Sequence, residues 1–459
     1  MKGIDALHFL QGVVMKKILI LSCFIFVLSV SSTAFAGKGP KGGPSFHKYE
    51  WTEQLTTDLG VNGQLPPEQG LPFWPGVGHW EPRAGLEAVE LHNMLFVIGG
   101  RTPIPNAGFA SIIHGDVWVS DDLGKTWDQL LDDPFDVVLW PNRAYHEAVT
   151  LGSHMYIMGG QNFLPGPPPG SPTIQNGCFD FSVFFNDVWR SPDGFNWEQL
   201  KANSGNDDSS HWQARAGLSA VTFKGKLWVM GGSQGDDFSI GGCGRTLFND
   251  VWYSSDGIEW HEATANVDKD DPEAIWRPRA GAVALVKGGW LYILGGENAF
   301  LPSPGNPVPY FNDVWRTKDG ENWEEVTAEG GAGWSPRPGH GCGVLANHFV
   351  CFGGYDPLGN PSDIWVSKDG AEWQPVSDSP WNNDPDPGCI EDAPDVTCDN
   401  IRYDFDVLTV KGGKGGMKPS IFTFGGDREL FPIPPLGIFP PADNWKRVEN
   451  DVWRYSPKD

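Results

Sequence analysis

Three carboxylates occupy equivalent positions in a repeated sequence pattern. Glu87, Glu147 and Asp406 each stand four residues after an arginine that leads an apolar stretch. Carboxylates beside cations on one inner strand are suited to general acid–base catalysis, because such surroundings shift their pKa. Buried ion pairs without any catalytic role have the same composition. We therefore name these three residues and His146 as catalytic candidates, on the condition that the protein is an enzyme.

Six arginines form a second group of candidates. Each would begin the innermost strand of a repeat, so that their guanidinium groups meet at one mouth of a central channel and bind an anionic ligand. A local alternative exists, because an aspartate begins the third strand of each repeat at the same end and the intervening glycines leave room for contact. We favour this structural pairing and keep ligand binding as the alternative. The candidates are Arg83, Arg143, Arg215, Arg279, Arg337 and Arg402.

Several residues near these arginines depart from the repeat. Two residues after the arginine most repeats have glycine, whereas the second has Tyr145 and the sixth has Asp404. A residue that breaks an internal repeat is a better candidate for function than one present in every copy. Tyr145, Asp404 and His340 are therefore further ligand-binding candidates. No metal site or cofactor is expected, since His146 and His340 fall in non-adjacent repeats; the acidic stretch 382–400 is a weak alternative for Ca²⁺.

Six copies of one four-strand unit position these residues. In the third copy a strand led by Arg215 turns at Lys-Gly into a strand that ends in Gly231-Gly232. A third strand begins at Asp250-Val251-Trp252, and a fourth carries Trp260. The arginine precedes the first glycine by 16 residues in each of the first five copies. Short apolar runs between turn residues at such a period predict an all-β repeat protein.

The two ends of the repeat region complement each other. The sixth copy has no fourth strand after Asp451-Val452-Trp453, and Tyr49-Glu50-Trp51 matches the fourth-strand sequence Phe195-Asn196-Trp197. We expect the N-terminal strand to complete the last copy and close a ring.

The glycine pairs and the fourth-strand tryptophans resemble the kelch repeat family, which includes the galactose oxidase propeller. The resemblance covers nearly all of residues 46–459 and implies a six-bladed β-propeller. It also implies that arginines at this position capture acidic peptides in some members, and that others are sialic acid mutarotases. Ser120-Asp121-Asp122 and the residues that follow resemble the Asp-box turn of sialidases, which is a structural motif.

The N-terminal region has the pattern of a secretory signal. Lys16-Lys17 precedes the apolar run 18–30, and Ala34-Phe35-Ala36 fits a cleavage site. We expect a signal peptide over residues 1–36, with Met15 as a plausible true start, then a short flexible segment over 37–45. Removing residues 1–36, which hold three lysines and one aspartate, leaves 30 basic and 57 acidic residues and a net charge of −27. That charge disfavours nucleic acid and anionic membranes. The expectation is a secreted or periplasmic protein with no membrane span after cleavage.

Six cysteines remain after cleavage, which predicts disulfides in an oxidising compartment. Counting from the turn places Cys342 directly opposite Cys351 in a non-hydrogen-bonded pair, at a Cα separation of roughly 4.5 Å. Buried thiols are the alternative there. Two further pairings follow from loop positions: Cys178–Cys243 and Cys389–Cys398.

These observations support two functions. The first is binding of a carbohydrate or an acidic protein segment at the channel mouth, where the loops 163–172, 300–311 and 429–441 are rich in Pro and Phe. The second is a sugar-acting enzyme, a mutarotase or a glycosidase of the sialidase type, that uses the channel carboxylates and arginines. We lean toward binding without catalysis.

Overall fold

The chain divides into two units, residues 1–44 and 45–459, and the residues that the structure describes belong to the second. The structure is a computed structural model. Among the described residues, no helix is long and apolar enough to cross a membrane. The described residues are 46–55, 79–103, 111–131, 140–163, 174–175, 178–179, 182–204, 208–235, 245–267, 275–299, 309–355, 363–378, 402–412, 418–428 and 448–458.

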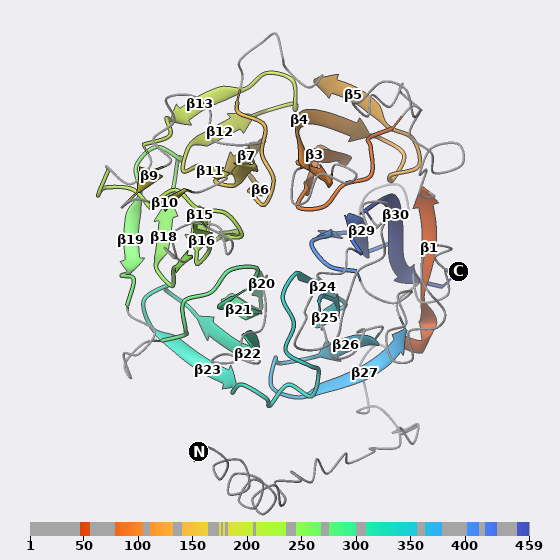
Figure 1. Cartoon of the computed structure of the whole chain (residues 1–459). Helices are drawn as coiled ribbons and strands as arrows, with labels where there is room; N and C mark the ends of the chain where they lie inside the picture. Colours follow the sequence, from red (N-terminus) through yellow and green to blue (C-terminus); the bar gives the residue numbers. More distant parts are fainter. Residues whose placement is uncertain are drawn as a thin grey trace, which may run out of the picture. The chain divides into compact units, whose positions relative to one another are not determined.

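The second unit is a six-bladed β-propeller, as the sequence predicts (Figure 1). Each blade is a four-stranded antiparallel sheet. The first blade contains β2 (Glu87–Leu91), β3 (Met94–Pro103), β4 (Ser111–Ser120) and β5 (Asp128–Leu131), and the second contains β6 (Glu147–Leu151), β7 (His154–Met158), β12 (Val188–Ser191) and β13 (Glu198–Lys201). The third contains β14 (Ser219–Phe223), β15 (Lys226–Met230), β18 (Val251–Ser254) and β19 (His261–Thr264). The fourth contains β20 (Val283–Lys287), β21 (Trp290–Glu297), β22 (Tyr310–Thr317) and β23 (Trp323–Thr327).

The fifth blade contains β24 (His340–Leu345), β25 (His348–Gly353), β26 (Asp363–Ser367) and β27 (Trp373–Asp378). The sixth contains β28 (Asp406–Val410), β29 (Ser420–Asp427), β30 (Val448–Pro457) and β1 (Tyr49–Leu55). Short additional elements are η1 (Phe46–Lys48) and the pairs β8 (Gln161–Phe163) with β11 (Ser182–Phe184), β9 (Ile174–Gln175) with β10 (Cys178–Phe179), and β16 (Ser233–Gln234) with β17 (Thr246–Leu247).

The outer strand of the sixth blade comes from the other end of the chain. β1 pairs antiparallel with β30, with Trp51 opposite Tyr455 and Tyr49 opposite Pro457. Figure 1 shows β1, in red, beside the blue β30. The two strands pack their aromatic rings together, since the Trp51 and Tyr455 rings lie 4.9 Å apart.

Hydrophobic contacts between neighbouring blades form the core. Val97 of the first blade and Phe424 of the sixth belong to one buried cluster, and both are fully buried. Five of the six leading arginines follow a tryptophan by three residues, and these five tryptophans are also buried, with an exposed fraction of 3 % or less. These rings, which belong to the buried core, are Trp80, Trp140, Trp212, Trp276 and Trp334.

One of the three expected disulfides is present. Cys342 and Cys351 lie opposite each other on β24 and β25 and form a disulfide with a Cα separation of 4.1 Å. This confirms the register count from the turn. The pairing Cys389–Cys398 and the residue Cys243 lie outside the described residues, as does the side chain of Cys178.

Candidate functional site

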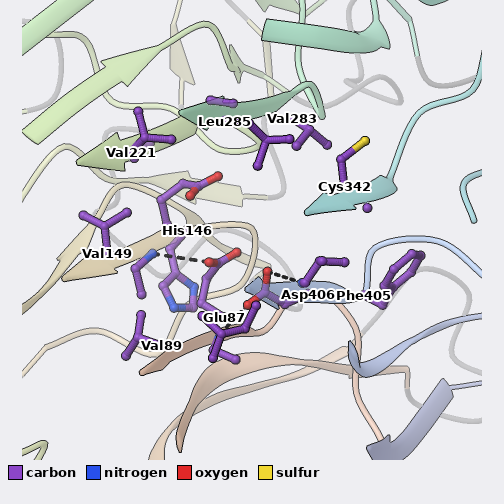
Figure 2. A pocket seen from close by; sticks show the side chains of 18 of the residues that line it. Glu87, Val89, His146, Val149, Val221, Val283, Leu285, Cys342, Phe405 and Asp406 are labelled. Carbon is purple, nitrogen blue, oxygen red and sulfur yellow. Dashed lines mark hydrogen bonds between the residues drawn. The ribbon is translucent and has the colours of Figure 1, made fainter. Parts of the chain in front are cut away.

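The three carboxylates begin innermost strands of adjacent blades and face one cavity. Asp406, Glu87 and Glu147 are the first residues of β28, β2 and β6, which follow one another around the ring. They line a central cavity of about 490 Å³ (Figure 2). Each side chain keeps partial solvent exposure, since it faces this cavity. The ring thus brings the catalytic candidates together, although Asp406 lies more than 300 positions from Glu87 in sequence.

Each carboxylate also bonds the backbone of the next blade. Asp406 accepts hydrogen bonds of 2.6 Å from the amides of Ala88 and Val407. Glu87 accepts a longer one, 3.4 Å, from the amide of Ala148. These contacts fix the carboxylates in place and join inner strands across blade boundaries.

Burial raises the pKa of all three groups, and repulsion from neighbouring carboxylates raises the pKa of Glu87 and Glu147 further. Removal from water is the largest cause in each case, and it raises the pKa of Asp406 to about 6. The pKa of Glu87 lies well above its usual range because of burial, then the charges of Asp406 and Glu147. Burial and the charge of Asp406 do the same to the pKa of Glu147. The cavity therefore contains carboxyl groups that exchange protons closer to neutral pH than exposed ones do.

The opposite side of the cavity has a different chemistry. At the positions equivalent to the three carboxylates, the third, fourth and fifth blades carry Ser219, Val283 and Gly341. Figure 2 shows Val283 and Leu285 among the side chains lining the cavity. One cavity thus has a polar side made by the sixth, first and second blades and a predominantly apolar side made by the other three.

The six leading arginines are buried and paired within their own blades. Arg143, for example, donates hydrogen bonds of 2.7 and 2.8 Å to the two carboxylate oxygens of Asp187 and one of 2.9 Å to the carbonyl of Gly159. The same aspartate accepts a bond from Trp189. The equivalent pairs are Arg83–Asp116, Arg215–Asp250, Arg279–Asp313, Arg337–Asp363 and Arg402–Asp451.

The exposed fraction of these six arginines is 3 % or less. The structural pairing that the sequence favours is confirmed. Ligand binding by the arginines stays a prediction, and a buried guanidinium that hydrogen-bonds an aspartate of its own blade has little surface to offer to a ligand.

His146 and His340 pack between blades. A Cβ placed on Gly99 would lie 2.9 Å from the His146 ring, so the imidazole occupies the space that this glycine leaves. His340 lies in the same way against Gly295. Burial, then a neighbouring arginine, lowers the pKa of His146 well below its usual value and the pKa of His340 to about 3. Both imidazoles are therefore neutral, and their position corresponds to Leu86, Leu218 and Phe405 in other blades.

Tyr145 and Asp404 line the cavity beside the carboxylates. Each stands two residues before the carboxylate of its own blade. The Tyr145 hydroxyl accepts a hydrogen bond of 2.7 Å from Nε of Arg101. Arg101 in turn forms a salt bridge with Asp427.

Sequence reasoning missed Arg101 and Asp427. Both follow the glycine pair of their blade directly, and the residues at this position are buried in all six blades. The sequence could have pointed to them. The two glycines are the same in all six blades, whereas the residue that follows them differs from blade to blade. That set is Arg101, Gln161, Ser233, Glu297, Tyr355 and Asp427.

One group of described residues approaches metal-binding geometry. Ligand atoms of Glu81, His114 and Asp116 lie within 4.8 Å of one another. Arg83 bonds both carboxylates of this group, at 2.8 Å to Glu81 and 2.6 Å to Asp116. The positive charge of the Arg83 guanidinium would repel a metal cation bound to these carboxylates. The acidic stretch 382–400 considered for Ca²⁺ lies outside the described residues.

Comparison with known proteins adds no family assignment. A scan of the sequence against known protein families finds no match, and a search among curated proteins finds no similar sequence. The six-bladed propeller therefore rests on the structure, and the kelch resemblance stays a prediction.

Proposed function

We propose that the protein binds a small carbohydrate in the central cavity. The observation that carries this is the contrast between the two sides of that cavity, with Glu87, Glu147 and Asp406 on one side and Val283 and Leu285 on the other. A sugar has the same contrast, because hydroxyl groups alternate with apolar C–H faces. A volume of about 490 Å³ lies within the range of small-molecule sites.

The cavity favours neutral or cationic sugars over acidic ligands. Among the described residues that line the cavity, Lys411 is the only lysine or arginine, and it is exposed. The carboxylates repel an anion. An acidic protein segment held by the leading arginines is for this reason the weaker of the two binding hypotheses. The Pro-rich loops at the arginine end lie largely outside the described residues and carry no part of this proposal.

Calorimetric titration of the protein with four sugars tests the proposal. We expect binding of D-glucose, N-acetyl-D-glucosamine or D-glucosamine, and none of D-glucuronate. Glu147→Gln keeps the shape of the side chain and removes its charge, and we expect it to weaken binding about 10-fold, as for loss of one charged hydrogen bond. Glu198→Gln, on the exposed outer strand β13, is the matched control. Absence of binding by all four sugars would remove the proposal.

The raised pKa values favour catalysis as a second candidate. A carboxyl with a pKa of about 6, such as Asp406, transfers protons efficiently near neutral pH. In aldose mutarotation one carboxyl protonates the ring oxygen while a carboxylate takes the proton of the anomeric hydroxyl, and the reverse transfer closes the ring. Asp406 and Glu147 would fill these roles. Polarimetry of fresh α-D-glucose tests this, and a rate equal to that of buffer would exclude it for this sugar.

A secreted or periplasmic location belongs to the same proposal. The Cys342–Cys351 disulfide supports it, because such bonds persist in oxidising compartments. Fractionation of cells that express the full chain tests it, with protein retained in the cytoplasm as the contrary result.

A further inference from the structure

Six residues at equivalent positions surround the channel, and backbone hydrogen bonds join five of their six neighbouring pairs. We call these six residues the channel belt. Each stands two positions after the leading arginine of its blade. All six have left-handed backbone conformation, with φ between 51° and 61°. The channel belt consists of Gly85, Tyr145, Gly217, Gly281, Gly339 and Asp404.

Backbone hydrogen bonds join the belt from blade to blade. The amide of Tyr145 donates to the carbonyl of Gly85 at 2.9 Å, and the amide of Gly85 donates to the carbonyl of Asp404 at 2.9 Å. Gly217 and Gly281 continue the series at 2.9 Å each. Because the same bond is made at successive positions, the left-handed conformation is imposed by the ring and not by the residue type.

Glycine adopts this conformation without steric cost, and four blades use it. A bulky residue such as Tyr145 does not, because its Cβ crowds the backbone in the left-handed region. Aspartate tolerates the conformation better but still less well than glycine. The chain therefore retains side chains at two belt positions where glycine would satisfy the fold. Strain kept in this way points to a role for the side chain.

Both side chains lie where the ligand would be. Tyr145 and Asp404 line the cavity, two residues before the strands β6 and β28, which begin at Glu147 and Asp406. The neighbouring belt glycines make room for them. A Cβ on Gly85 would come within 2.9 Å of the Tyr145 ring, and one on Gly339 would collide with the Asp404 carboxylate.

Arg101 and Asp427 fix the position of the Tyr145 side chain. Its hydroxyl accepts the 2.7 Å hydrogen bond from Arg101, which the salt bridge to Asp427 fixes in turn. With the hydroxyl end anchored, the ring is pre-oriented at the belt end of the cavity. The ring also packs against Phe184, Ala214 and Ala216, so the part of it that lines the cavity is the aromatic surface that a ligand can contact.

We propose that Tyr145 and Asp404 form the end wall of the ligand site and determine which sugar it accepts. The Tyr145 ring stacks on the C–H face of a pyranose, and the Asp404 carboxylate accepts hydrogen bonds from its hydroxyl or ammonium groups. This inference rests on the proposed carbohydrate binding and adds the residues that select the ligand.

Calorimetric titration with D-glucose, D-glucosamine and N-acetyl-D-glucosamine tests it in single variants. Tyr145→Gly and Asp404→Gly restore the residue that four blades carry, so the backbone accepts them. We expect each to raise Kd about 10-fold, which corresponds to loss of one stacking contact or one charged hydrogen bond. Lys224→Gly is the matched control, because Lys224 has φ of 51°, as Asp404 has, but lies in an exposed hairpin turn. It should leave Kd unchanged.

Two conservative variants keep the test decisive if a glycine variant folds poorly. Asp404→Asn retains shape, and we expect it to weaken binding as Asp404→Gly does. Tyr145→Phe retains the ring, and we expect Kd to stay within about 3-fold of wild type, because stacking needs the ring and not the hydroxyl.

The outcomes separate the two proposals. If the wild-type protein binds a sugar and the Tyr145 and Asp404 variants bind it with unchanged Kd, these two residues do not form the end wall of the site. Carbohydrate binding itself would then still be supported. Loss of binding in Tyr145→Phe equal to that in Tyr145→Gly would also overturn the stacking role. Wild-type protein that binds none of the three sugars would remove carbohydrate binding itself, and the end wall with it.

Discussion

Asp406 accepts a hydrogen bond of 2.6 Å from the backbone amide of Ala88, a residue of the next blade. The bond joins the last blade of the chain to the first. Glu87 makes the equivalent contact from the first blade to Ala148 of the second. The carboxylates that define the candidate site thus also connect the inner strands of adjacent blades, so we expect their protonation to affect stability and, if the proposed function holds, ligand binding.

Asp406 should make the protein less stable as pH rises from about 4 to about 6. Its pKa is about 6 in the folded protein and 3.8 ordinarily, so the unfolded chain releases this proton first. The stability that the protonated group contributes is complete below its unfolded pKa and is lost as pH rises through the folded one. The full effect is at most roughly 3 kcal/mol, reduced where cavity water screens the charge. Asp406→Asn removes this titration, and urea unfolding at pH 4 to 7 measures the difference. Parallel stability curves for variant and wild type would contradict it.

His146→Leu should stabilise the protein, most of all in acid. Both ring nitrogens of His146 are buried without a hydrogen-bond partner, and leucine stands at this position in the first and third blades. The folded pKa of His146 is depressed, so the unfolded chain binds a proton that the fold does not, and wild-type stability falls as pH drops below about 6.5. Thermal unfolding at pH 5 and 7.5 should show a larger gain in Tm for the variant at pH 5. A gain that is equal at both pH values would show that the histidine does not titrate on unfolding.

Arg143→Ala should destabilise the protein by about 3–5 kcal/mol, because it leaves the buried Asp187 charge without its partner. Arg277→Ala is the control: Arg277 pairs with Glu329 on the surface, with side chains 58 % and 44 % exposed, and should cost about 0–1 kcal/mol. Denaturant unfolding measures both. If Arg143→Ala instead retained full stability and lost ligand binding, the arginine would be a binding residue after all.

Replacing Cys342 by Ala and Cys351 by Val should lower stability by about 3 kcal/mol, the amount that a loop of this length contributes to the unfolded-state entropy. The replacements are those found at the equivalent positions of the third blade, Ala220 and Val229, so packing is preserved. Unfolding of wild type with and without reductant gives an independent measure. A reductant that leaves wild-type Tm unchanged would show that the disulfide contributes nothing.

The blades, their order and the carboxylate cluster could be read from the sequence. Six copies with a constant arginine-to-glycine distance define equivalent positions, and Glu87, Glu147 and Asp406 become neighbours once the ring is assumed to close. The pairing of Cys342 with Cys351 followed in the same way, because a hairpin register depends only on residues near the turn.

The sequence by itself determined what is local and repeated: where strands begin, which residues are equivalent, and which copies deviate. Only the tertiary structure decided where the side chains point. In the structure the leading arginines pair with aspartates of their own blades. Tyr145 has the left-handed backbone conformation typical of glycine, and Arg101 donates a hydrogen bond to its hydroxyl. The reason is physical. These outcomes depend on contacts between blades, and such contacts form only when the whole ring is closed and each inner strand is held by the next.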